Sequence, residues 1–346
     1  MKTLRVAVIG AGANTRARHL PGLLEQPGVR LVGVVNRTPA STARAAADFD
    51  IPRRYAHWRE AAEDPEADAV VIGTWPDMHA RATLAALAAG KHVLCEARMA
   101  RDAAEAHAML RAAQARPDQV AQLVPSPFSL EVDATVARFV AEGRLGELLV
   151  VEHRPAAGFL DRAAPLHWRQ DAARSGVNTL ALGIVYEMLL RWVGEATRVL
   201  ARGRVFARLR RDEQGAAHAV AVPDHLDVLA DLACGAHLHL QQSAVTAHRT
   251  ETGTWLYGDR GVLRFDGTTL FFGDRDADAL APVAIPPEER GGWRVEEEFV
   301  QAVRGEAPVR RTTFEDGVRY MEFTEAARRS AARGRAVPLP LGLDGA

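Results

Sequence analysis

The chain has 346 residues, of which 48% are hydrophobic and 25% charged, and its formal net charge at pH 7 is −1. This length favours two domains at roughly 150 residues each, and the near-neutral charge argues against nucleic acid or a membrane surface as a partner. No apolar run approaches the roughly 20 residues of a membrane span, and a strand-like run starts so close to Met1 that we expect no signal peptide.

The first 125 residues alternate between apolar runs and helix-like stretches. The runs, which we expect to be strands, are 4–9, 29–35, 69–72, 92–95 and 120–124. The stretches with helical periodicity are 16–26, 39–48, 78–89 and 102–115. Apolar strands separated by helices indicate a parallel sheet covered on both faces. We therefore predict an α/β Rossmann domain over residues 1–125.

The pattern changes after Pro125. A helix over 130–142 and a strand over 147–152 are followed by a polar loop and a long helix over 177–193. The strand-like runs that come next are 198–209, 224–232, 236–246, 254–257, 262–265 and 269–272, before helices over 293–304 and 314–333. Strands in series favour an open, mostly antiparallel sheet. We expect an α+β substrate and oligomerisation domain over 126–346, whose terminal helices could pack back on the first domain.

The first strand runs directly into Gly10-Ala11-Gly12. In a Rossmann turn the first glycine makes the bend and the second lets the backbone approach a pyrophosphate. Thr15 stands where a third glycine is usual, and the helix that follows Ala13 and Asn14 can still offer its N-terminal amides to phosphate. We predict a dinucleotide site that includes these residues.

The second strand ends in Asn36, Arg37 and Thr38. An acidic residue at the position of Asn36 would bind the ribose 2′-hydroxyl of NAD, and none is present. Arg37 could pair with a 2′-phosphate or stack on adenine, and Thr38 could donate its hydroxyl. The sequence therefore favours NADP(H), with NAD(H) possible.

Several further motifs resemble those of the glucose–fructose oxidoreductase/inositol dehydrogenase (Gfo/Idh/MocA) family. They are Gly-Thr-Trp-Pro-Asp-Met-His at 73–79, Ala-Gly-Lys-His-Val-Leu-Cys-Glu at 89–96, Gly143-x-x-Gly146, Trp168-Arg169, Arg191-Trp192 and Gly-Asp-Arg-Gly at 258–261. The resemblance implies that NAD(P) binds in the Rossmann domain and that sugars or polyols are oxidised or reduced. It also adds cofactor-binding residues, namely Thr74, Trp75, Pro76, His79, Glu96, Ala97 and Arg98.

The chain departs from this family where its members carry acid–base groups. The usual Glu-Lys-Pro triplet reads Glu96-Ala97-Arg98 here, and the positions of the family's Asp and His fall at Ala181 and Val185. A second acidic position falls at Met188. Tyr186 and Glu187 lie on another side of the expected helix, where packing or a salt link is the better interpretation.

The remaining candidates for proton transfer and substrate binding are polar residues of loops and strand ends. Histidine suits proton transfer near neutral pH, whereas arginine keeps its proton. We name His167 as a candidate base and Arg98 as a group that could orient an oxyanion. The candidate substrate-binding residues are His153, Trp168, Arg169 and Asn178, and His248 and Arg249 follow a later strand.

Three functions stay open. The first is an NAD(P)-dependent oxidoreductase with a non-standard acid–base site, acting on a sugar, a polyol or a related hydroxylated small molecule. The second is a non-catalytic NADP(H)- or sugar-binding regulatory protein, and the third a cofactor-dependent lyase, isomerase or glycosidase. The open sheet predicts a homodimer or homotetramer. Only two cysteines, without zinc-ligand spacing, predict a cytoplasmic protein with no metal site.

Overall fold

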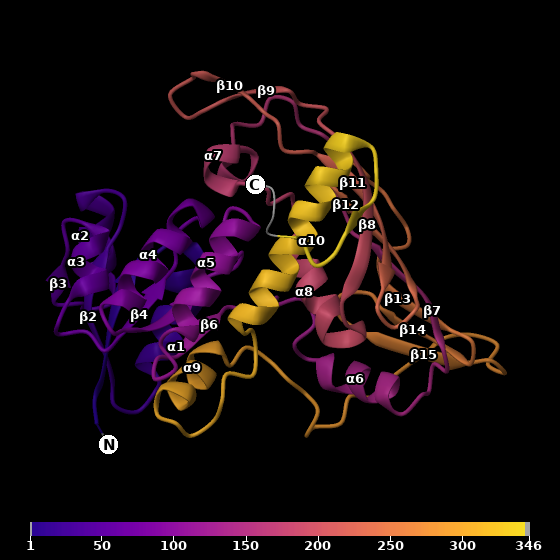
Figure 1. Ribbon diagram of the computed structural model, residues 1–346, viewed down its shortest axis with the longest axis horizontal. Coiled ribbons are helices and arrows are strands. Elements are labelled where there is room, and N and C mark those ends of the chain that lie inside the picture. Colours follow the sequence, from indigo (N-terminus) through magenta and orange to yellow (C-terminus); the bar gives the residue numbers. More distant parts are fainter. Residues whose placement is uncertain (1, 343–346) are drawn as a thin grey trace. The chain divides into compact units, whose positions relative to one another are not determined.

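The computed structural model describes residues 2–342, and they divide into two units (Figure 1). The first unit extends to Pro125 and also contains Arg294–Val318. The second unit contains Ser126–Trp293 and the chain from Arg319 onward. No helix in the described part of the chain is both long enough and apolar enough to cross a membrane.

The first unit is built on a six-stranded parallel sheet with the order β3-β2-β1-β4-β5-β6. Its strands are β1 (Leu4–Ile9), β2 (Val29–Val35), β3 (Arg53–Arg54), β4 (Ala69–Ile72), β5 (His92–Cys95) and β6 (Ala121–Leu123). The central strands are buried on both faces, which explains their unbroken apolar runs. The parallel sheet confirms the prediction. Its strand order reverses between β1 and β4, where a sheet of this kind binds ligands beyond its carboxyl ends.

The helices of this unit connect its strands, except for α9, which comes from the later segment of the chain. They are α1 (Leu20–Leu24), preceded by the π-helical turn η1 (Thr15–His19), then α2 (Pro39–Asp48), α3 (Trp58–Glu63), α4 (Pro76–Ala88), α5 (Ala103–Gln114) and α9 (Val295–Val303). Both α2 and α4 have proline in the first turn, where its missing N–H is harmless. Asp102 caps α5 by accepting a hydrogen bond from the N–H of Glu105. The short elements β3 and α3 were not predicted.

The second unit is built on a nine-stranded sheet with the order β16-β15-β14-β13-β7-β12-β11-β8-β17. Its strands are β7 (Leu148–Arg154), β8 (Ala196–Arg204), β11 (His225–Leu232), β12 (His237–Ser243), β13 (Gly253–Gly258), β14 (Gly261–Phe265), β15 (Leu270–Asp274), β16 (Ala281–Pro282) and β17 (Val337–Pro338). A separate hairpin pairs β9 (Leu209–Arg211) with β10 (Ala217–Ala219). Among the described strand pairs of this nine-stranded sheet, only β7 and β12 run parallel, so the prediction of a mostly antiparallel sheet is confirmed.

One face of this large sheet is covered by helices. α8 (Leu182–Val193) and the later part of α10 (Phe314–Arg333) lie on that side (Figure 1), where Tyr186 and Phe323 stack at 3.6 Å and Ser330 accepts the N–H of Ala201. Residues of β11 and β12 alternate between this buried face and an accessible one. A third helix, α6 (Asp133–Ala141), is joined to α8 through Asp133 and Arg191.

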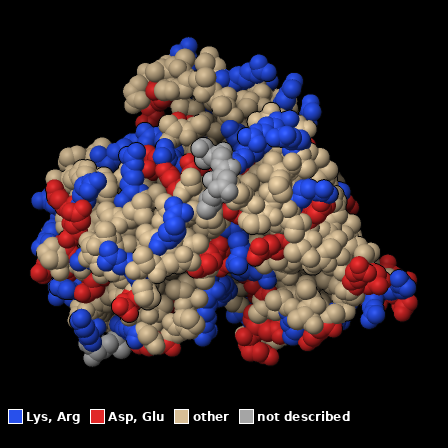
Figure 2. Space-filling view, in the orientation of Figure 1, with Lys and Arg blue, Asp and Glu red and all other residues tan. Residues whose placement is uncertain are grey.

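Two predictions about local structure were wrong. The expected helix over 177–193 begins only at Leu182, because Gly176 and Leu180 adopt positive φ angles of 63° and 49° that end the short helix α7 (Ala172–Ser175) and delay the next. Asn178 therefore lies in the turn before α8. The expected strand over 198–209 is interrupted after Arg204. In Figure 2 basic and acidic side chains are interspersed on the visible face, in keeping with the small net charge.

Candidate functional site

The glycine turn after β1 has the geometry of a nucleotide-binding turn. Gly10 has φ +90°, and a Cβ there would lie 2.7 Å from Cγ2 of Thr74 and 2.8 Å from the carbonyl carbon of Gly73. Its N–H donates to the carbonyl of Val35 at 2.8 Å. Gly12, Ala13 and Asn14 are exposed at the start of the helical segment, so this N-terminus is open to an anion.

Thr15 replaces the third glycine without opening the turn. Its side chain is buried and lies against Gly73, where a Cβ would come within 2.0 Å of Thr15 Oγ1 and 2.4 Å of the Gly10 carbonyl oxygen. The close approach of helix to sheet that a third glycine usually permits is therefore provided by a glycine at the end of β4.

Asn36 supports the turn from the end of β2. Its side-chain oxygen accepts the N–H of Ala11 at 2.6 Å, and its side-chain nitrogen donates to the carbonyl of Ser41 at 3.0 Å. These two bonds define which end of the amide is which. Asn36 thus holds the second strand against the glycine turn, and it brings no negative charge to the place where the ribose of a dinucleotide lies.

Arg37 and Thr38 follow Asn36 on the surface. The guanidinium of Arg37 lies 5.2 Å from the ring centre of Trp75, a cation–π distance, and Arg37 is exposed. Thr38 caps α2, because its hydroxyl accepts the N–H of Ser41 at 3.2 Å and the Ser41 hydroxyl reaches back to the Thr38 N–H. Arg37 is therefore presented on an aromatic surface, while the Thr38 hydroxyl is engaged in the cap.

His79 joins the loops that follow β4 and β5. The ring is fully buried, with Nδ1 2.8 Å from the carbonyl oxygen of Arg98 and Nε2 3.1 Å from that of Thr74. Burial lowers the pKa of this imidazole. Pro76 is buried at the start of α4, and Trp75 is its N-cap. His79 accordingly holds these two loops together through their backbone carbonyls.

Glu96 is the centre of a buried charge cluster that the sequence did not reveal. Its carboxylate accepts from the Asn14 side chain, from His19 Nε2 at 3.0 Å and from the N–H of Ala97 at 3.0 Å. His19 is fully buried and reaches Glu296 of α9 through Nδ1 at 2.5 Å. Burial alone would lower the pKa of His19, but the two carboxylates raise it to about 9. Burial acts to raise the pKa of Glu96, and the bonds from His19 and Asn14 lower it overall.

Arg98 and Ala97 occupy the positions at which the family has proline and lysine. Arg98 is only 3% exposed and Ala97 is half-buried, so the loop presents a methyl group in place of an amine. A guanidinium holds its proton at ordinary pH and can orient an oxygen but not take up a proton from it.

In the second unit, His167 is an exposed helix cap. Its Nδ1 accepts the N–H of Arg169 at 3.3 Å, and it begins the short 3₁₀ helix η2 (Trp168–Gln170). The Arg169 guanidinium lies 4.2 Å from the ring centre of Trp168. Burial and the nearby Arg169 charge lower the pKa of His167, so the ring is neutral near pH 7 and carries its proton on Nε2.

His153 and Asn178 are more enclosed. His153 lies on β7 with Nδ1 2.9 Å from the Thr254 hydroxyl, and burial lowers its pKa to about 4. Asn178 is 3% exposed, and its side-chain nitrogen donates to the carbonyl of Ser175 at 2.7 Å. Both residues are neutral and suited to hydrogen bonding.

The start of α8 carries no titratable side chain at the family's acid–base positions. Ala181 caps the helix, and Val185 and Met188 are buried. The backbone N–H of Ala181 donates to Gln242 Oε1 at 3.2 Å, a contact that the sequence did not reveal.

Tyr186 and Glu187 have structural roles, as their expected place on the helix predicts. The Tyr186 hydroxyl accepts the N–H of Ala196 at 2.7 Å. Glu187 is ion-paired with Arg191 and accepts the N–H of Ser126 at 2.9 Å. Neither side chain is available for proton transfer.

Comparisons with known proteins agree with this geometry. Residues 4–122 match the model of the Gfo/Idh/MocA oxidoreductase family with its NAD-binding Rossmann fold, and residues 134–264 match a C-terminal domain of the same family. Trans-1,2-dihydrobenzene-1,2-diol dehydrogenase from Bos taurus is 33% identical over 186 residues, which cover 52% of this chain and 53% of that protein. Levoglucosan dehydrogenase from Pseudarthrobacter phenanthrenivorans is 28% identical over 217 residues, covering 58% and 54%. The chain therefore spans about half the length of the curated relatives it matches.

Solved structures resemble the whole chain. A levoglucosan dehydrogenase in complex with NADH and L-sorbose superposes with a TM-score of 0.86 at 23% identity, covering 98% of this chain and 99% of that one. An oxidoreductase domain protein from Kribbella flavida gives a TM-score of 0.85 at 23% identity, covering 99% and 100%. At this level of identity the likeness shows a shared fold.

Proposed function

The chain belongs to the Gfo/Idh/MocA oxidoreductase family, and on that basis we propose that it is an NAD(P)-dependent oxidoreductase of CH–OH groups. The observation that carries the proposal is the glycine turn after β1, in which Gly10 lies so close to Gly73 and Thr74 that no Cβ fits there. We propose a sugar, polyol or related hydroxylated small molecule as substrate, since relatives include levoglucosan and dihydrobenzenediol dehydrogenases.

We propose that the first unit prefers NADP(H) to NAD(H). The exposed amides at Gly12, Ala13 and Asn14 suit the pyrophosphate. Asn36 leaves the ribose position without a carboxylate, and Arg37 is held against Trp75, where its charge could meet a 2′-phosphate. When bound, the nicotinamide would supply or accept the hydride.

We propose that Arg98 orients the reacting oxygen and that His167 is the proton acceptor. His167 is exposed and neutral near pH 7, as a base must be. Its Nδ1 would have to release the long bond from the Arg169 N–H to accept a proton.

Two substitutions separate this catalytic role from the capping role. His167→Asn keeps a good helix cap and removes the imidazole, whereas His167→Ala removes both. Loss of a general base lowers kcat by about 10²-fold or more in both variants. If His167→Asn keeps the kcat of the unmodified protein while His167→Ala does not, His167 acts only as the helix cap.

A non-catalytic NADP(H)- or sugar-binding protein is the second candidate, favoured by Ala97, Ala181 and Val185 at the family's acid–base positions. Mass spectrometry of the nucleotide that co-purifies with the protein, followed by nicotinamide absorbance with a panel of sugars and polyols, separates the two. A binder retains nucleotide and turns nothing over.

We further propose a homodimer or homotetramer formed through the accessible face of the large sheet. Leu200 and Leu229 pair across β8 and β11 and are 42% and 39% exposed, and Val150 on β7 is 38% exposed. Exposed apolar side chains gathered on one sheet face commonly mark an interface. A cytoplasmic location remains our expectation from the two free thiols of Cys95 and Cys234.

A further inference from the structure

His19 joins two carboxylates that come from distant parts of the first unit. Its imidazole is fully buried on η1, with Nε2 3.0 Å from Glu96 and Nδ1 2.5 Å from Glu296. The side chains of Glu96 and Glu296 are 14% and 5% exposed. Glu96 follows β5, whereas Glu296 lies on α9, which packs beside α1 (Figure 1). These three residues, the His19 cluster, are therefore an enclosed group of charges.

Helix α1 leaves room for one of the two carboxylates. Gly22 lies inside this short helix, and a Cβ there would lie 2.8 Å from Oε2 of Glu296. A glycine within a helix costs stability relative to alanine. Here its missing side chain leaves space for the Glu296 carboxylate beside the imidazole.

The geometry of the His19 cluster calls for a charged imidazole. An ionised carboxylate can only accept hydrogen bonds, and a neutral imidazole donates from one nitrogen alone. Both nitrogens of His19 meet a carboxylate oxygen, so both must donate. Burial opposes the charge, but the bonds to Glu296 and Glu96 outweigh it and raise the pKa of His19 to about 9. The three groups together then carry one negative charge.

Glu96 connects the His19 cluster to the expected cofactor residues. Its Oε1 accepts from both His19 and the side chain of Asn14, and its Oε2 accepts the N–H of Ala97. Asn14 is exposed at the start of the helical segment, and Ala97 directly precedes Arg98. One carboxylate therefore fixes a residue of the glycine turn and the loop after β5 at once.

Loss of the His19 proton would disturb both attachments. One ring nitrogen would then present a lone pair to a carboxylate, and the three groups would carry two negative charges instead of one. Added negative charge close to the helix start opposes a pyrophosphate, because such an N-terminus attracts anions through its amides. Both effects weaken the binding of a dinucleotide.

Other titratable groups of η1 and α4 are paired, exposed or neutral. Arg16 is paired with Asp48, and Arg18 is exposed to solvent. His79 acts on Glu96 from α4, and burial lowers its pKa, so that this ring is neutral near pH 7. The change of charge that matters between pH 7 and pH 10 thus comes from the imidazole of the cluster.

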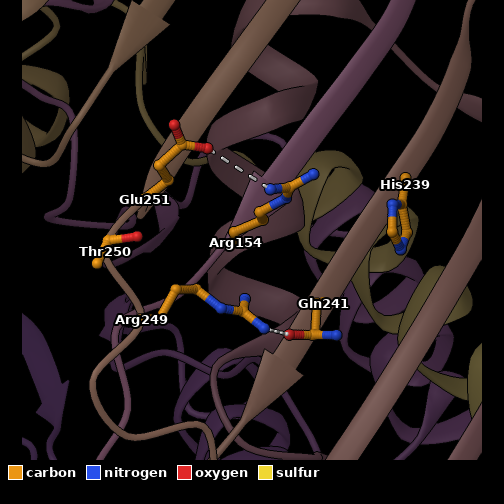
Figure 3. A pocket seen from close by; sticks show the side chains of 6 residues that line it. All are labelled: Arg154, His239, Gln241, Arg249, Thr250 and Glu251. Carbon is orange, nitrogen blue, oxygen red and sulfur yellow. Dashed lines mark hydrogen bonds and ion pairs between the residues drawn. The ribbon is translucent and has the colours of Figure 1, made fainter.

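The charged side chains on the large sheet show the opposite arrangement. In the hollow of Figure 3, Arg154 pairs with Glu152 and lies 3.9 Å from the largely exposed Glu251. Arg249 donates to Gln241 in the same hollow. Charges near solvent are screened, so a change in one of them has a small effect. In the enclosed His19 cluster the same change of one charge has a larger effect.

We propose that His19 and Glu296 are positioning residues for the cofactor: by holding Glu96, the charged imidazole keeps the glycine turn and the loop after β5 ready to bind a dinucleotide, and loss of its proton weakens that binding. The inference rests on the proposed cofactor function and adds two residues that touch neither the cofactor nor the substrate.

Fluorescence titration of the full-length protein with NADPH between pH 7 and pH 10 tests the proposal. The 2′-phosphate is ionised throughout this range, since a phosphate monoester has its second pKa at about 6. We expect the Kd of NADPH to rise about tenfold as the pH passes through about 9, a usual size for coupling between two sites. Glu296→Gln should move the midpoint of this rise down by about one pH unit or more, because one carboxylate is lost. Glu297→Gln, which changes an exposed pair on the same helix, should leave the midpoint unchanged.

Histidine-ring NMR of the unmodified protein gives a second readout that needs no variant. The ring that titrates at about 9 is distinguishable from His79 and His153, whose pKa values are lowered. Coupling is reciprocal, so a tenfold loss of NADPH affinity requires the pKa of His19 to be about one unit higher in the NADPH complex than in the free protein.

Three results would overturn the positioning role while leaving cofactor binding intact. They are a Kd of NADPH that is constant from pH 7 to pH 10, a His19 titration that NADPH does not move, and a Glu296→Gln variant that loses stability but keeps the unmodified pH profile of binding. The last result would assign the cluster to folding alone. Absence of both NADPH and NADH binding at every pH would overturn the proposed cofactor function and this inference with it.

Discussion

The buried cluster of His19, Glu96 and Glu296 predicts a specific dependence of stability on pH. The pKa of His19 is raised from 6.5 to about 9, a difference worth about 3 kcal/mol of stability to the first unit. Because the pKa is higher in the folded state, this contribution is fully present below pH 6.5 and is lost as the pH rises through about 9.

Glu296→Gln removes one of the two carboxylates and leaves Glu96 at 3.0 Å from the imidazole. Since one partner remains, we expect a loss of about 1–2 kcal/mol at pH 7, less than the 3–5 kcal/mol for a buried charge left wholly unpaired. The pKa of His19 should fall, so the variant should lose its remaining contribution at lower pH than the unmodified protein.

Urea unfolding between pH 6 and pH 10 measures this difference. Glu297→Gln is the matched control, because Glu297 lies on the same helix in an exposed pair with Arg294 and should change stability by less than about 1 kcal/mol. The difference between Glu296→Gln and the unmodified protein should be largest at pH 6, where the His19 contribution is fully present, and should vanish as the pH rises past about 9. A difference that is constant across this range would refute the charged His19.

Further substitutions test the cofactor turn and the sheet face. Arg37→Gln should raise the Kd of NADPH about tenfold in fluorescence titrations, from the loss of a charge-assisted bond of about 1.5 kcal/mol, and an equal loss for NADH would contradict a phosphate contact. Gly73→Ala should lower stability by more than about 2 kcal/mol, because its Cβ meets the Gly10 backbone at 2.4 Å as well as Thr15, and an unchanged thermal melt would show that the turn can shift. Leu229→Glu should reduce the mass measured by light scattering. Leu24→Glu, at an exposed leucine of the first unit, should leave the mass unchanged. An unchanged mass for Leu229→Glu would show that the subunit interface does not include this face of the sheet.

Most of the parallel sheet was predictable because its strands other than the short exposed β3 coincide with apolar runs. The antiparallel strands were predictable as a series, although their pairing was not. Their order brings β7 between β12 and β13, far from its neighbours in the sequence. Strand pairs of this kind are set by tertiary packing that no local pattern records.

The parts of the site that the sequence did not reveal depend on long-range contacts. His19 meets Glu296 across 277 positions of the chain, so neither residue signals its partner. Leu180 adopts a positive φ that its residue type does not favour, and this delayed the start of α8. One signal was present. Thr15 in place of a third glycine called for a compensating small residue nearby, and Gly73 at the end of β4 provides it.

The most direct test of the proposed oxidoreductase is nicotinamide absorbance of the purified protein with NADP⁺ or NADPH and a panel of sugars, polyols and their carbonyl counterparts. The panel should include levoglucosan and trans-1,2-dihydrobenzene-1,2-diol, the compounds for which two related dehydrogenases are named. We expect at least one compound to change the absorbance at a catalytic rate, faster with the phosphorylated cofactor. Tight NADPH binding with no absorbance change across the whole panel would contradict an enzyme and favour the non-catalytic binder.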